Sequence, residues 1–258
     1  MSVHKNNIYW MKLERYFEYI KHGFEPLNSF KMKKELNPKV WDDFHIKDEI
    51  RSKLLIIAQD FYNSTSIDAE IKDIVLTGSL ANYNWSNKYS DFDLHILIDF
   101  SEVNDDIELV SKLAKSVKSM WNLQHDITIS GYKVEVYIQD TKEKHISSGV
   151  FSLLENKWLI KPVKNDTNID VKLIEIKAEP IMYSIDNLEK IIDRIDYEDF
   201  NKRLNVEWEK IKKFRKSGLE NEGGELSTGN LVFKLLRRNG YIDKIINMKR
   251  ESYDKQFN

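Results

Sequence analysis

The spacing of apolar residues changes along this chain, and that change limits the folds that the chain can adopt. Residues 7–22 and 47–63 carry apolar side chains at intervals of three and four, which is the spacing of an amphipathic helix. Between 71 and 163, short β-branched runs are interrupted by one more helical pattern, at 105–123. From about residue 172 onward the pattern is helical. The sequence therefore predicts an α+β protein with a C-terminal helical region.

The predicted strands lie in the first two-thirds of the chain. The segments that favour strands are 71–77, 90–100, 126–140 and 149–163. The third contains two strand segments around Gly131, and the fourth is predicted to be a hairpin that turns at Asn156 and Lys157. We therefore divide the chain into 1–168, a sheet-containing domain with N-terminal helices, and 169–258, a helical region.

The helical region has boundaries of its own. Pro180 predicts a break, and the long charged stretch that follows is expected to end at Gly218. After a polar loop, a final helix is predicted to begin near Asn230, with Ser227 or Thr228 as its N-cap.

Composition excludes several classes of protein. The 258 residues include no cysteine, which rules out disulfides, thiolate metal sites and cysteine nucleophiles. No apolar run reaches the roughly 20 residues of a membrane span, so we expect a soluble, cytoplasmic protein without a membrane partner. The net charge is only −2, but residues 201–258 hold 14 Lys or Arg against 8 Asp or Glu. This basic excess fits either solvated helix faces or a surface that meets a phosphate-bearing ligand.

The most informative segment is 74–100. In it a hydrophobic strand leads to Gly78 and Ser79, a sharp turn that is predicted to open a short helix from Leu80 to about Trp85. Glycine lets the backbone approach a phosphate closely, and the N–H groups of a helix start, with the serine hydroxyl, suit anionic oxygens. The turn therefore predicts a phosphate-binding element.

Three carboxylates follow this turn. Eleven residues separate Ser79 from Asp91, and Asp93 comes two positions later on a predicted strand. Side chains two apart on a strand share a face, so Asp91 and Asp93 converge while Phe92 turns into the core. Glu135, on a further predicted strand, is the candidate third acid. Because close carboxylates repel unless a cation lies between them, and hard oxygen ligands suit Mg²⁺, this arrangement predicts a site for two Mg²⁺ ions roughly 3.5–4 Å apart.

In combination, these residues resemble the signature of the DNA polymerase β superfamily of nucleotidyltransferases. That signature is a hydrophobic-Gly-Ser run, a spacer of about a dozen residues, and then Asp-hydrophobic-Asp-hydrophobic. Here residues 77–79 and 91–94 match it, with Glu135 as the third carboxylate, and Ala81 and Ser90 match further common positions.

The resemblance covers about residues 70–140 and departs from the family in one place, since many minimal members have Arg-Gly where this chain has Asn82 and Tyr83. The flanking regions are similar to stand-alone members encoded by bacteriophages, which would place the protein in the host cytoplasm. The resemblance implies that the domain 1–168 is catalytic and that its core is a mixed β-sheet flanked by helices, as in nucleotidyltransferases. It would transfer a nucleoside monophosphate from an NTP such as ATP to a hydroxyl acceptor and release pyrophosphate. An RNA end, tRNA above all, is the favoured acceptor, while a protein or a small molecule stays open.

The resemblance also assigns roles. Asp91 and Asp93 would ligate both Mg²⁺ ions, Glu135 would ligate the ion nearest the acceptor, and Gly78 with Ser79 would hold the β- and γ-phosphates. The three acids are thus the expected catalytic and metal-binding residues.

Four further residues are candidates for binding the nucleotide. Ser90 matches a family position beside the acids, and Lys88, in the loop before them, either contacts the triphosphate or is a solvated loop lysine. Lys234 and Arg238 are four apart on one face of the final predicted helix, where they form either an anion site or an ordinary basic face. His95 shares strand parity with the acids and is given no chemical role.

Two alternatives stay open. Asp91 and Asp93 could cap backbone or pair with Lys88, and Glu135 could be an exposed strand residue facing Lys133. The chain could also be a non-catalytic module that retains the fold and senses nucleotide or binds a partner protein. The presence of all three carboxylates favours the enzyme, because a degenerate site has no need of them.

Overall fold

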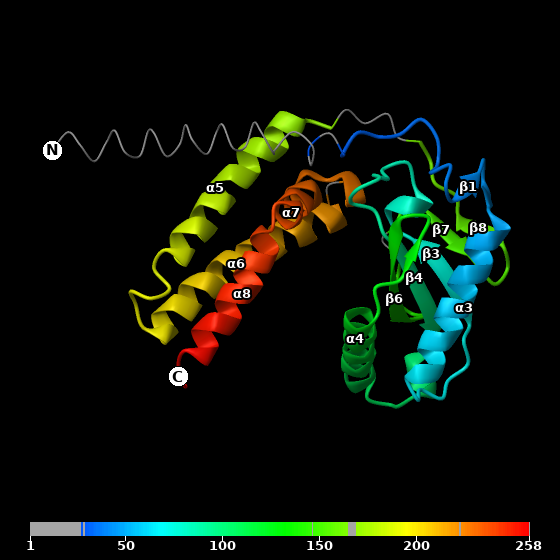
Figure 1. Cartoon of the computed structure of the whole chain (residues 1–258), viewed down its shortest axis with the longest axis horizontal. Coiled ribbons are helices and arrows are strands. Elements are labelled where there is room, and N and C mark those ends of the chain that lie inside the picture. Colours follow the sequence, from blue (N-terminus) through cyan, green and yellow to red (C-terminus); the bar gives the residue numbers. More distant parts are fainter. Residues whose placement is uncertain (1–26, 28, 146, 165–168, 222, 258) are drawn as a thin grey trace. The chain divides into compact units, whose positions relative to one another are not determined.

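The computed structural model describes residues 27, 29–145, 147–164, 169–221 and 223–257 (Figure 1). These residues form two compact units, one within Met32–Thr167 and one within Asn168–Asn258 together with the described residues before Met32. The first unit contains the sheets, and the second is mainly helical. The helix predicted at 7–22 lies outside the described residues. Among the helices that are described, none has both the length and the apolar character that a bilayer crossing requires.

A mixed six-stranded sheet forms the framework of the first unit. A small two-stranded sheet precedes it in the sequence. The strands are β1 (Trp41–Asp42), β2 (His45–Ile46), β3 (Asp73–Thr77), β4 (Phe92–Ile98), β5 (Thr128–Ile129), β6 (Tyr132–Asp140), β7 (Val150–Ser152) and β8 (Lys157–Ile160). The large sheet has the order β5-β6-β4-β3-β7-β8, in which β4 and β6 are parallel and the other neighbours antiparallel. The predicted α+β class is therefore confirmed.

The hairpin formed by β7 and β8 turns earlier than predicted. Its turn covers 153–156, and Lys157 is already the first residue of β8. Asn156 has a positive φ of 54°. Asparagine tolerates this left-handed conformation better than most residues, so the turn ends there.

Two helices pack against the large sheet: α3 (Asp48–Ser64) and α4 (Ile107–Gln124), both close to the predicted bounds. α4 lies beside β6, where the side chain of Asn122 hydrogen-bonds the N–H and the C=O of Val136. Leu54 and Phe61 of α3 and Val110 and Ala114 of α4 are buried in the same apolar core as the inward-facing residues of β4 and β6. The helical spacing of these residues is the reason that each helix has one face to bury.

One face of the large sheet carries polar side chains. In the parallel pairing of β4 with β6, Asp93 lies opposite Glu135 and His95 lies opposite Tyr137. In the antiparallel pairing of β3 with β4, Thr77 lies opposite Asp93. Because residues in register on neighbouring strands share a face, these side chains form two adjacent rows. The pairing therefore places two acids beside the end of β3.

Among its described residues, the second unit contains four α-helices of more than ten residues. They are α5 (Val171–Glu189), α6 (Tyr197–Asn221), α7 (Thr228–Arg238) and α8 (Tyr241–Asp254). They bury a separate apolar core, which also includes Leu27 and Phe30. Ser227 is the N-cap of α7, as predicted: its hydroxyl oxygen accepts a hydrogen bond from the N–H of Asn230 at 3.3 Å.

The structure corrects three predictions in this region. Pro180 does not break α5, because it lies on the exposed side of the helix, and the carbonyl that loses its hydrogen bond belongs to the exposed Ile176. Gly218 does not end α6: a Cβ there would lie 2.5 Å from Ser227 Oγ, so glycine serves close packing. The final helix is two helices, α7 and α8, because Gly240 adopts a left-handed φ of 76° between them.

Candidate functional site

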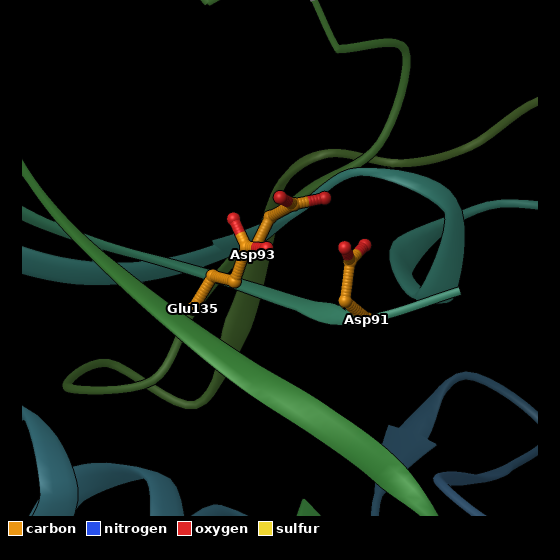
Figure 2. A group of neighbouring side chains, drawn as sticks. All are labelled: Asp91, Asp93 and Glu135. Atoms are coloured by element: carbon orange, nitrogen blue, oxygen red, sulfur yellow. The ribbon is translucent and has the colours of Figure 1, made fainter. Parts of the chain in front are cut away.

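Three carboxylates meet on the polar face of the sheet. Asp91, Asp93 and Glu135 each offer an oxygen within 4.8 Å of the others, and all three are half-buried. Figure 2 shows the side chains rising from the same side of the β4 and β6 ribbons. Asp93 and Glu135 are register partners, while Asp91 precedes β4 by one residue and shares the parity of Asp93. The structure thus brings together the three acids that the sequence singled out.

This cluster could hold a metal ion. Three carboxylates so close repel one another, and a cation between them removes that repulsion. Their hard oxygen atoms, with no nitrogen or sulfur donor in the group, fit a hard divalent cation.

Tyr137 fixes one member of the cluster. Its hydroxyl donates a hydrogen bond to Glu135 Oε2 at 2.5 Å. Burial raises the pKa of Tyr137, and the charges of Asp93 and Glu135 raise it further, so the phenol keeps its proton and remains a donor. A carboxylate held through one oxygen has its rotamer fixed, which prepares the other oxygen to bind a cation.

The turn after β3 lies against the cluster. Gly78 has a φ of 73°, and a Cβ at this position would lie 1.8 Å from Asp93 Oδ2. Its N–H donates to Ser147 Oγ at 3.2 Å. Glycine is therefore needed here for two reasons, the left-handed backbone and the space that the Asp93 carboxylate occupies.

The helix after this turn is shorter than predicted. The sequence predicts a helix from Leu80 to about Trp85, but the structure has one 3₁₀ turn, Ser79–Ala81. Asn82 ends it in extended conformation, because its side chain accepts a hydrogen bond from the N–H of Tyr83 and donates one to Ser148. These local bonds compete with helix formation.

The serines and the lysine predicted to bind nucleotide lie around the same turn. Ser79 Oγ and Ser90 Oγ are 2.7 Å apart, and Ser90 Oγ accepts the N–H of Ser86 at 2.8 Å. Lys88 lies in the loop between them, with its ammonium 5.4 Å from the centre of the Tyr89 ring. Ser90 directly precedes Asp91, so its contact with Ser79 links the Gly78 turn to the first of the three acids. Nucleotide binding by these residues stays a prediction.

Lys234 and Arg238 belong to α7 in the helical unit. The Arg238 guanidinium donates to Ser29 Oγ and lies 4.5 Å from the centre of the Phe30 ring. Arg238 thus packs against residues of its own unit. Nucleotide binding by Lys234 and Arg238 stays a prediction.

Sequence reasoning missed Tyr137 and Ser147. The signal for Tyr137 was strand parity, because it follows Glu135 by two positions, as His95 follows Asp93. The rings of His95 and Tyr137 stack with their centres 4.6 Å apart. Burial lowers the pKa of His95 to about 4, which keeps the imidazole neutral at neutral pH. Ser147 carried no local signal, since it lies 69 positions from Gly78.

Comparisons of the chain with family models, with curated proteins and with solved structures find no match in any of the three. The site must therefore be interpreted from its own residues.

Metal binding at this cluster can be measured through stability. We expect Mg²⁺ or Mn²⁺ to raise the midpoint of thermal unfolding, because an ion that binds only the folded state stabilises it. The gain is about 2.7 kcal/mol when the ion is at about 100 times its Kd. Asp93→Asn should lose this shift, and Asp126→Asn, which changes an exposed acid paired with Lys133, should keep it. An unchanged midpoint of the wild-type protein with both ions would contradict the metal assignment.

Proposed function

We propose that this chain is a Mg²⁺-dependent nucleotidyltransferase that moves a nucleoside monophosphate from an NTP to a hydroxyl acceptor. The observation that carries this proposal is the meeting of Asp91, Asp93 and Glu135 beside the Gly78 turn. A cluster of carboxylates that can bind a cation would by itself fit many proteins. A carboxylate cluster that touches a glycine-serine turn fits the transfer of a phosphate-bearing group, and the resemblance to the DNA polymerase β superfamily agrees with this function.

The residues divide the work as follows. Asp91 and Asp93 would hold two Mg²⁺ ions, and Glu135 would hold the one nearest the acceptor. When bound, the ions neutralise the charge of the transferring phosphoryl group and favour ionisation of the attacking hydroxyl. Ser79, at the turn, orients the β- and γ-phosphates. Glu135, oriented by Tyr137, accepts the proton of the acceptor. The protein's contribution is therefore positioning and electrostatic stabilisation.

The test is transfer of label. The full chain is incubated with each of four α-labelled NTPs, Mg²⁺, total RNA and a protein extract. We expect one NTP to label one acceptor pool, with no labelling in EDTA. A γ-labelled NTP should leave its label in pyrophosphate, because the bond broken lies between the α- and β-phosphates.

One outcome would change the proposal, and another would identify the acceptor. If NTP binds with Mg²⁺ but no pool becomes labelled, the protein is a non-catalytic nucleotide sensor. If RNA is labelled, its binding should weaken steeply with added salt, because lysines and arginines displace counterions from the phosphates.

A further inference from the structure

A pocket adjoins the carboxylate cluster on the same face of the sheet. None of the three proposed catalytic acids lines it, so the proposed reaction assigns it no role so far. Its volume is about 290 Å³. We name it the α4 pocket; its polar lining includes His95, Ser111, Lys115, Lys118, Tyr137 and Gln139. This volume is near the lower end for small-molecule sites, so the pocket can take one small molecule or the end of a longer one.

The α4 pocket has a cationic wall. Lys118 is half-buried, with its ammonium 3.9 Å from the centre of the Tyr137 ring. Neither Lys115 nor Lys118 forms an ion pair with a carboxylate within the part of the chain that the structure describes. Glu143 also lines the pocket, which leaves two cations against one anion. A phosphate group is the small anion that such lysines bind well.

The α4 pocket also holds a buried polar atom that needs a partner. Nδ1 of His95 is buried and makes no hydrogen bond to any described residue. The ring also interacts with the side chain of Gln139. Because an unsatisfied buried polar atom is costly, a ligand group at this position would be favoured. A hydroxyl fits either tautomer, since it can both donate and accept.

The position of the pocket fits one side of the proposed reaction. Across the sheet the order is Glu135 on β6, Asp93 on β4 and the Gly78 turn after β3. In an in-line displacement the attacking and leaving oxygens are on opposite sides of phosphorus. If pyrophosphate leaves on the Gly78 side, the acceptor approaches on the Glu135 side. Tyr137 connects the two regions, because its hydroxyl touches Glu135 and its ring carries Lys118.

We propose that the α4 pocket binds the acceptor, and that the acceptor is a ribose-phosphate group with a free hydroxyl. This inference rests on the proposed function. The acceptor oxygen forms a bond to the α-phosphorus, and the bond from that phosphorus to the β-phosphate oxygen breaks. Pyrophosphate leaves with the electron pair, and the hydroxyl proton passes to Glu135. Lys115 and Lys118 hold the acceptor's own phosphate.

The test measures equilibrium binding of two probes to the full chain with Mg²⁺ present. The probes are ribose 5-phosphate and a short 5′-phosphorylated oligoribonucleotide. The variant Lys115→Gln/Lys118→Gln should bind both more weakly, by about tenfold per lysine. Lys112→Gln is the matched control, because Lys112 is on the same helix but does not line the α4 pocket and is paired with Glu108. It should bind as the wild type does.

The outcomes separate this inference from the proposed function. Equal binding by the wild type and the double variant overturns the inference, whether or not transfer occurs. Lysine-dependent binding without transfer from any NTP overturns the proposed function and the acceptor role, and retains the pocket as a phosphate site. If transfer occurs, the double variant should raise the KM of the acceptor and leave that of the NTP unchanged. Tighter binding of the oligoribonucleotide would identify an RNA end; equal binding would identify a small sugar phosphate.

Discussion

Replacing Asp93 with Asn is expected to lower the rate of nucleotidyl transfer by about 1,000-fold or more. The substitution keeps the size of the side chain and removes its charge. Asp93 is the register partner of Glu135 and lies two positions from Asp91, so both proposed ion sites lose a ligand. The measurement is the initial rate of label transfer at saturating NTP and Mg²⁺. Asp91→Asn should behave in the same way.

The fold should survive this change. Without metal, removal of one of three close acids relieves repulsion, so the free energy of unfolding should stay the same or rise. Circular dichroism and thermal unfolding in EDTA measure this. Asp126→Asn controls for the chemistry of the substitution and should keep the wild-type rate. Full activity in both Asp91→Asn and Asp93→Asn would remove these acids from the mechanism.

Gly78→Ala is expected to abolish metal binding and transfer and to destabilise the protein by about 1–3 kcal/mol. Two physical effects combine. The residue has a φ of 73°, which disfavours any side chain, and the new Cβ would lie 1.8 Å from Asp93 Oδ2. Because both atoms cannot occupy this space, the Asp93 carboxylate must turn away from its neighbours. The measurements are chemical denaturation, the Mg²⁺-induced shift in unfolding midpoint, and label transfer.

Gly240→Ala separates the two effects. Gly240 also has a positive φ, 76°, although its ψ is 5° where that of Gly78 is −158°, and a Cβ there would meet nothing within 4 Å. It should therefore cost about 1 kcal/mol, from the left-handed backbone alone, and keep both metal binding and transfer. A Gly78→Ala variant that retains the metal-induced shift would show that the Gly78 turn does not determine the position of Asp93.

Much of the fold follows from short-range pattern. The helices α3 and α4 and the strands β3, β4 and β6 lie within a few residues of the predicted segments. The alternation that defines a strand also places Asp91 and Asp93 on one face, as expected from two residues of the same parity. The cap at Ser227 is equally local, since it depends on a hydroxyl and an N–H three positions apart.

Contacts between distant segments account for what the sequence did not indicate. The predictions at Pro180 and Gly218 were wrong in the same way. Each residue commonly ends a helix, but here each lies inside one because of its surroundings. Pro180 faces solvent, whereas Gly218 faces Ser227 across a packed contact. No local pattern carries that information.

Residues close together in the chain encode the order of the elements, the Gly78 turn and the shared strand face of Asp91 and Asp93. Their spacing in the sequence is therefore enough to predict them. The gathering of Glu135 with Asp93, the hydrogen bond from Tyr137 and the lysine wall of the α4 pocket arise from the parallel pairing of β4 with β6 and the packing of α4. A shift of that pairing by one residue would turn Glu135 to the other face of the sheet. Strand register is set by the packing of the whole core, and for that reason the sequence could name Glu135 as a candidate, but only the folded structure places it beside Asp93.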